Sequence, residues 1–240
     1  MNKDTKITIK TLKKLNVPYK VHENGDVTTS GNIDLHGYGQ DFYAPKLTKA
    51  GNIDLWEYKR KFNAPKLKDA GFIDLDGYGY DFNVPNLTTT KNIDLHGYEY
   101  KFKAPNLREA GDVYLREYKH DFIAPKLKEA GNIDLWGYEH DFIAPNLTTT
   151  KNIDLWGCGQ DFYAPKLREV RHICLWEYKR NFYAPKLKDA GYIYLQGYEQ
   201  DFYAPKLTKA GNIDLRGYEH DFYAPNLTLT KQTKDLKNEH

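Results

Sequence analysis

Apolar and polar positions recur along this chain with a period of 20 residues. From residue 31 to residue 230 the sequence divides into ten units of 20 residues without insertion or deletion, and a fixed period of this kind is typical of repeat architectures. In each unit the segment N-I-D-L-x alternates apolar and polar, as at 132–136, which predicts a half-buried strand with Ile and Leu inward. A second segment, D-F-x-A, predicts another short strand with Phe142 and Ala144 inward.

Turn residues separate these segments. A Gly or Glu follows the first strand, and every unit has a proline after the second, from Pro45 to Pro225. Proline removes an amide donor and marks a corner that a central strand does not cross. A leucine after the proline and an alanine near the end of the unit complete six inward positions, too few for an independent core. The sequence therefore predicts an all-β fold, a right-handed parallel β-solenoid of ten coils, about 50 Å long at about 4.8 Å per coil.

The two ends of the chain depart from the repeat. Residues 1–30 are predicted to form an N-terminal cap, residues 31–230 the ten-coil solenoid and residues 231–240 a polar C-terminal tail. Within the cap, residues 5–15 are compatible with a short helix or a strand, and Asn24-Gly25 predicts a hairpin. The tail has one apolar residue, Leu236. Either the tail folds over the last coil, or the exposed coil end pairs with a second copy in a homodimer.

One stretch of the repeat resembles a known group of proteins. The run LTKAGNIDLRG at 207–217 is similar to the short-period leucine-rich-repeat-like β-solenoids of bacteria and their phages, whose coils read L-T-x-x-G-x-L-x-L-x-G. An ordinary leucine-rich repeat has Asn three residues after its last strand leucine, and an apolar residue two further on. This chain has Tyr138 and His140 at those positions. Because the asparagine ladder that sets horseshoe curvature is missing, we expect a straight or gently twisted rod.

Composition and charge exclude several classes of protein. The 35 basic and 33 acidic residues leave a net charge of +2, so no global field attracts nucleic acid or an acidic membrane, and 15% aromatic residues argue against disorder. The two cysteines, Cys158 and Cys174, do not make a disulfide framework and favour a reducing compartment. No apolar run is long enough to span a bilayer, and the first residues lack the apolar core of a secretion signal. We therefore expect a cytoplasmic protein without a membrane partner.

Stacking turns each position of the unit into a column on the surface, and one outward column stands out. The residue after the first-strand leucine is the most variable of the unit, and all four tryptophans of the chain occupy it. Exposed Trp and Arg on a rigid face are typical of binding hot spots. The alternative is that the indoles only cover the sheet and one another. The predicted partner-binding residues, which include two neighbouring aspartates, are Trp56, Arg116, Asp134, Trp136, Asp154, Trp156, Trp176 and Arg216.

A second surface combines basic and aromatic side chains. Lysines follow the proline in many units, and tyrosines lie three residues before them. Such interleaving could follow a single-stranded nucleic acid, so RNA binding is an alternative hypothesis with Lys126, Lys166, Lys186, Tyr163 and Tyr183. Acidic residues interrupt the stripe, which equally fits a solvated corner. Aromatic residues beside Asp and Asn would also suit a glycan.

The columns do not predict catalysis. His120 and His140 share a column but have no nucleophile placed by the repeat, and the only serine is Ser30. No CxxC or HxxH spacing indicates a metal site, so we expect no enzyme activity and no cofactor. Glu replaces Gly in every third coil, at Glu57, Glu117 and Glu177. Duplication of a three-coil unit explains this period, and a charged rim beside the tryptophans is the alternative.

These observations predict a non-enzymatic intracellular scaffold that binds another protein through its Asn, Asp and Trp face. The abundance of Lys, Asn, Ile and Tyr indicates an AT-rich bacterial or phage genome. By analogy with that setting, the partner would be a host enzyme or a defence nuclease complex, inhibited in the manner of anti-CRISPR proteins. A glycan- or RNA-binding repeat protein is the alternative.

Overall fold

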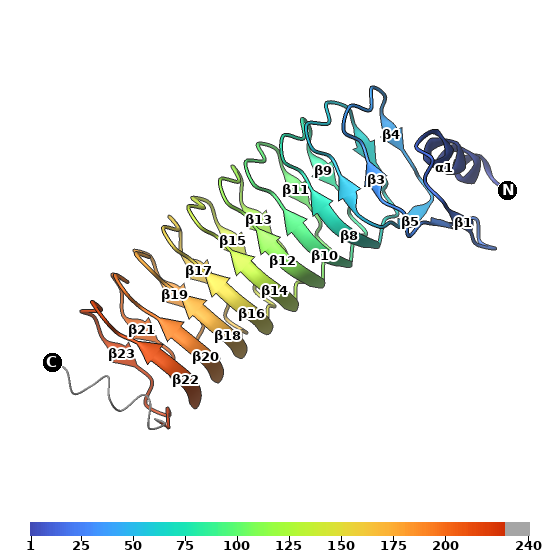
Figure 1. Ribbon diagram of the computed structural model, residues 1–240. Coiled ribbons are helices and arrows are strands. Elements are labelled where there is room, and N and C mark those ends of the chain that lie inside the picture. Colours follow the sequence, from blue (N-terminus) through green and yellow to red (C-terminus); the bar gives the residue numbers. More distant parts are fainter. Residues whose placement is uncertain (229–240) are drawn as a thin grey trace.

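The chain folds as a parallel β-solenoid of about ten turns, as the 20-residue period predicted. The computed structural model describes residues 1–228. Figure 1 shows the coils stacked along a nearly straight axis, with the N-terminal helix at one end, so the rod does not curve into a horseshoe. One coil adds one strand to each face.

Within residues 1–228, the larger sheet has 13 strands and follows the stack of coils. Its strands pair in parallel with a shift of 20 residues, so that Ile93 lies between Ile73 and Val113. The first pair, β1 with β2, is antiparallel. The strands of this sheet are β1 (Lys20–Val21), β2 (Val27–Thr28), β3 (Ile33–Asp34), β5 (Leu47–Lys49), β6 (Ile53–Asp54), β8 (Asp69–Asp74), β10 (Thr89–Asp94), β12 (Glu109–Tyr114), β14 (Glu129–Asp134), β16 (Thr149–Asp154), β18 (Glu169–Cys174), β20 (Asp189–Tyr194) and β22 (Lys209–Asp214).

These strands begin earlier and end earlier than the alternating pattern predicted. We expected a strand over 132–136, whereas β14 covers Glu129–Asp134 and stops before Leu135 and Trp136. The reason is a tight turn, in which the Tyr138 amide donates to the Leu135 carbonyl at 3.0 Å and Gly137 has a φ of 63°. The tryptophan column therefore lies on the bend that follows the sheet.

The second face is built from two-residue strands, as the D-F-x-A segment predicted. They form separate small sheets of two, two, four and two strands along the rod. After each strand the proline sits in a turn, as where the Leu47 amide donates to the Ala44 carbonyl at 3.1 Å. The strands are β4 (Phe42–Tyr43), β7 (Phe62–Asn63), β9 (Phe82–Asn83), β11 (Phe102–Lys103), β13 (Phe122–Ile123), β15 (Phe142–Ile143), β17 (Phe162–Tyr163), β19 (Phe182–Tyr183), β21 (Phe202–Tyr203) and β23 (Phe222–Tyr223).

The core contains a seventh inward column that the sequence pattern missed. The residue after the first turn is tyrosine in nearly every coil, and its side chain is buried, as at Tyr138 with 0% exposure. Its hydroxyl accepts from the Phe122 amide at 2.9 Å and donates to the His120 carbonyl at 2.7 Å. Neighbouring rings stack, with 6.2 Å between the centroids of Tyr118 and Tyr138. We call this column the tyrosine ladder: Tyr58, Tyr78, Tyr98, Tyr118, Tyr138, Tyr178, Tyr198 and Tyr218.

The N-terminal residues pack against the first coil. Helix α1 (Lys3–Lys14) begins at Asn2, whose side chain accepts from the Thr5 amide, and buries Leu12. Its Thr8 hydroxyl accepts from the Lys46 amide at 3.0 Å, which ties the helix to the first coil. The β1–β2 hairpin turns through Gly25 with a φ of 80°, and β2 pairs in parallel with β5. The predicted polar tail at 231–240, and pairing of a second copy with the end that it follows, lie outside the described residues.

Candidate functional site

Each coil presents one side chain at the tip of the turn that follows the larger sheet. In the coil of Trp136, the Asp134 carboxylate accepts from the Trp136 amide at 3.0 Å, and Gly137 then adopts a positive φ. A positive φ at the third residue of a turn, and not at the second, defines a type II turn. The second residue of such a turn points outward, so the variable column is displayed on every coil.

Four successive coils place Arg116, Trp136, Trp156 and Trp176 in contact, and we call these residues the tryptophan strip. The Arg116 guanidinium lies 3.6 Å from the centroid of the Trp136 ring. Trp136 stacks on Trp156 with 5.4 Å between ring centroids, and Trp156 meets Trp176 edge to face at 6.4 Å. The three indoles remain between 36% and 41% exposed. A cationic end thus continues into a row of half-exposed indoles.

Glutamates flank both ends of this strip. Glu117 follows Arg116, with 3.8 Å between its carboxylate and the Arg116 Nε. Glu177 follows Trp176 and accepts from the Trp156 Nε1 at 3.2 Å. Both glutamates hold a left-handed backbone, with φ of 58° and 51°. Two of the three period-three glutamates therefore contact the tryptophan strip, Glu117 at Arg116 and Glu177 at Trp156.

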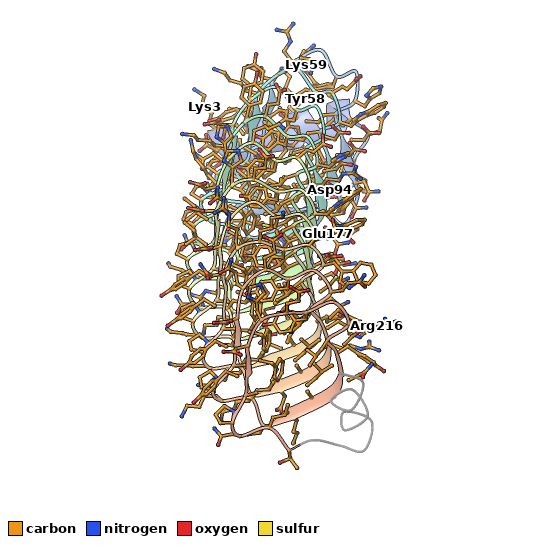
Figure 2. The ribbon with its side chains drawn as sticks, turned by 90° about the vertical axis from the view of Figure 1, so that its left-hand side faces the viewer. Lys3, Tyr58, Lys59, Asp94, Glu177 and Arg216 are labelled. Atoms are coloured by element: carbon orange, nitrogen blue, oxygen red, sulfur yellow. The ribbon has the colours of Figure 1, made fainter. Side chains whose placement is uncertain are left out.

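Two predicted residues of the same column lie apart from the strip. Trp56 belongs to a coil nearer the N-terminus, where it stacks on His36 with 4.5 Å between ring centroids. Arg216 is two coils beyond Trp176 and pairs with Asp214 of its own coil, with 2.6 Å between Nη2 and Oδ2. Figure 2 shows Glu177 and Arg216 on the same side of the rod. Neither Trp56 nor Arg216 extends the continuous row.

The aspartates predicted to bind a partner form hydrogen bonds within the turns. Asp134 and Asp154 accept from the amides of Trp136 and Trp156 at 3.0 and 3.1 Å. Their side chains are half-buried at the end of the larger sheet. Burial, and then the neighbouring Asp134 charge, raises the pKa of the Asp154 carboxyl above its ordinary value. These carboxylates hold the turns that display the indoles.

The residues predicted to bind RNA lie on the second face and its corner. Tyr163 and Tyr183 stack on one another with 5.1 Å between centroids and an angle of 4° between their planes. Lys126 and Lys166 donate to the Asn106 and Asn146 side chains at 2.5 and 2.6 Å, while Lys186 points into solvent. Lysines and tyrosines therefore share this face, but these two tyrosine rings already contact each other.

Within residues 1–228, no group of three or more His, Cys, Asp or Glu side chains is arranged to hold a metal ion. His120 contributes its Nε2 to a 3.0 Å hydrogen bond with the Glu99 carbonyl. Cys158 is buried and Cys174 partly buried, and burial raises the pKa of the Cys174 thiol to about 11. In this part of the chain, no helix is both long and apolar enough to cross a membrane.

The fold and the tryptophan strip define a repeat protein of the β-solenoid class with a coil of 20 residues. Comparisons of this chain with models of protein families, with curated proteins and with solved structures found no match. The site is therefore interpreted from its own geometry.

Proposed function

We propose that this protein is a non-enzymatic scaffold that binds another protein through the tryptophan strip. The observation that carries the proposal is the unbroken contact from Arg116 through Trp136 and Trp156 to Trp176 on a rigid row of turns. Tryptophan and arginine dominate the energetics of protein interfaces. Their mutual packing fixes the side chains before binding, which lowers the entropy lost on association.

The packing of the rings favours a protein partner over a base or a sugar. A base stacks on an open aromatic face, and a sugar ring binds such residues in the same way. Here Trp136 has Arg116 over its ring and is also stacked against Trp156. Trp136 therefore leaves mainly its ring edge for a partner, and the edge-to-face contact of Trp156 with Trp176 makes the strip uneven, which suits the irregular surface of a protein.

The repeat resembles short-period solenoids of bacteria and their phages, and this resemblance suggests the kind of partner to test first. We propose an intracellular host enzyme or defence nuclease that is inhibited by occlusion, because a row of packed, half-exposed indoles on a stacked solenoid can bind by covering a surface. The two cysteines, one buried and one partly buried, are unpaired, which supports a reducing compartment.

The experiment is capture of partners from a host lysate by the whole protein and by the variant Trp136→Ala/Trp156→Ala/Trp176→Ala. We expect at least a tenfold loss of the captured partner, because removing hot-spot tryptophans costs about 2 kcal/mol or more each. The matched control is Trp56→Ala, which removes an exposed tryptophan of the same column outside the strip.

Each substitution removes about 0.5–1.5 kcal/mol of aromatic packing at a half-exposed site, so we expect the variant to stay folded. Circular dichroism checks this. Capture that survives the triple substitution would refute the proposal. Capture that disappears both after RNase treatment and after substitution of Lys126, Lys166 and Lys186 would establish the nucleic-acid alternative.

A further inference from the structure

A second exposed row of apolar side chains runs along the other face of the rod. It begins at β13 and occupies the outward position of six successive strands. We call it the lateral strip: Ile123, Ile143, Tyr163, Tyr183, Tyr203 and Tyr223. Its four tyrosines are between 43% and 51% exposed, and Ile123 is 50% exposed. In the coils before β13, three of the four residues in this column are polar: Asn63, Asn83 and Lys103.

The lateral strip is rigid and separate from the tryptophan strip. Tyr163 stacks on Tyr183 and Tyr203 on Tyr223, with centroid distances of 5.1 and 5.2 Å and nearly parallel planes. The backbone beneath each of these two pairs is paired in parallel strands, and β19 and β21 belong to two consecutive small sheets. The tryptophans follow the larger sheet of each coil, whereas these side chains stand on the second face. A contiguous exposed apolar row of this kind marks an interaction surface.

Opposite charges border the two sides of the lateral strip. Each strand is preceded by a column that is acidic in five of the six coils: Asp121, Asp141, Asp161, Asp201 and Asp221. The turn after the strand carries lysine in four of them: Lys126, Lys166, Lys186 and Lys206. Within residues 1–228, none of these nine side chains takes part in an ion pair of 4.0 Å or less.

This arrangement is self-complementary in one orientation only. A two-fold axis that runs along the rod, between two facing strips, exchanges the left and right flanks and keeps each coil opposite its equivalent. Asp201 of one copy then faces Lys206 of the other. With the two rods antiparallel, the axis crosses the strip and each acidic column faces its own equivalent. Like charges opposed across an interface cost several kcal/mol.

From this charge pattern we infer that the lateral strip binds a second copy of the chain, with the two rods parallel and in register. Six coils span about 30 Å, and the six residues from the acidic to the basic column span about 20 Å. Their product, about 600 Å² per copy, puts the interface near the lower end of the range for specific complexes. The dimer therefore depends on concentration, and it does not depend on the proposed function of the tryptophan strip.

The test is sedimentation equilibrium of the whole protein over a wide concentration range. We expect a monomer–dimer equilibrium that Tyr203→Glu weakens at least tenfold. Tyr43→Glu is the matched control, because Tyr43 is an exposed tyrosine of the same column outside the strip and its substitution should leave association unchanged. Monomer at every concentration, or a dimer that Tyr203→Glu leaves intact, would overturn the inference.

Charge exchange tests the orientation. Asp201→Lys and Lys206→Asp should each weaken the dimer at least tenfold, and the double variant should restore it, because Lys at 201 would again face Asp at 206. Asp201 also accepts from the Asp221 amide at 3.1 Å. Asp201→Lys and the double variant both lose this hydrogen bond, whereas Lys206→Asp keeps it, so its loss does not explain a rescue. Thermal unfolding confirms the fold of each variant, and failure of the double variant to associate would refute the parallel arrangement.

Discussion

Three coils depart from the others at a single turn residue, where glutamate replaces glycine. Glu57, Glu117 and Glu177 have a left-handed backbone conformation, and the other coils have glycine at this position. A side chain in that conformation costs about 1 kcal/mol or more. Their spacing of 60 residues fits duplication of a three-coil unit. Two of these strained residues contact the tryptophan strip, because Glu117 lies beside Arg116 and Glu177 accepts from Trp156.

Another departure is Cys158, which interrupts the tyrosine ladder between Tyr138 and Tyr178. At most other ladder positions the tyrosine hydroxyl accepts from the phenylalanine amide of the preceding coil, as Tyr178 does from Phe162 at 2.9 Å. The thiol is smaller and instead contacts the Gln160 carbonyl at 3.6 Å.

We predict that Cys158→Tyr stabilises the protein. The new ring would stack between its neighbours and its hydroxyl would accept from the Phe142 amide, for a gain of about 1–3 kcal/mol. For a chain of this size that gain raises the Tm by several degrees, measured by thermal unfolding. The matched control is Tyr138→Cys, which should lower the Tm. A lower Tm for Cys158→Tyr would show that the coil has closed around the thiol.

At the scale of elements, the tyrosine ladder links stability to alkaline pH. Burial raises the pKa of Tyr78, Tyr118 and Tyr198 from 10.0 to about 12. Below pH 10 both the folded and unfolded states keep the phenol proton, so the ladder's contribution is complete. Between pH 10 and 12 only the unfolded chain releases protons, and the free energy of unfolding falls as pH rises.

We therefore expect cooperative unfolding above pH 10, with each buried tyrosine contributing on the order of 1–2 kcal/mol to the loss. Circular dichroism should follow the loss of sheet, and tyrosinate absorbance should follow ionisation. Ionisation of all tyrosines in one step near pH 10, with the sheet intact, would contradict the buried ladder.

The elements also show what the sequence could predict. Alternation identified the inward Ile, Leu and Phe, and the constant period fixed the vertical pairing of coils, because both depend on local pattern. Two features depended on the turn. Gly137, with its positive φ, turns the chain after Leu135, so the strand ends before Trp136 and Tyr138 points into the core. Because the sequence prediction continued the alternating pattern to Trp136, its strand boundary was wrong. Contact among the indoles followed from the period, whereas the Arg116–Trp136 stacking required side-chain geometry.

At the scale of the whole molecule, the solenoid is a linear stack in which each coil contacts its neighbours. Stability in such a stack is approximately a sum of coil and interface contributions. The tryptophan strip and the lateral strip together begin at Arg116, so the coils before it serve as a spacer between the strips and the N-terminal cap.

Deletion of residues 51–70 should therefore leave a folded and functional protein. The new junction joins Ala50 to Gly71, which repeats the Ala-Gly step already present at 50–51. The Tyr78 hydroxyl would then accept from the Phe42 amide, as the Tyr58 hydroxyl does now. We expect one cooperative thermal transition, a Tm within several degrees of the parent, and unchanged partner capture and self-association, because both strips remain whole.

Deletion of residues 51–60 is the control, because it removes half a coil. The inward columns of the following half-coil then have no equivalent beneath them, and apolar side chains such as Phe62 and Leu67, now buried, lose their stacking partners. Burial of such side chains stabilises a protein by about 1.5–3 kcal/mol each, so this variant should aggregate or lose its sheet signal. Equal tolerance of both deletions, or unfolding after removal of the complete coil, would show that stability does not reside in the stacking of equivalent coils.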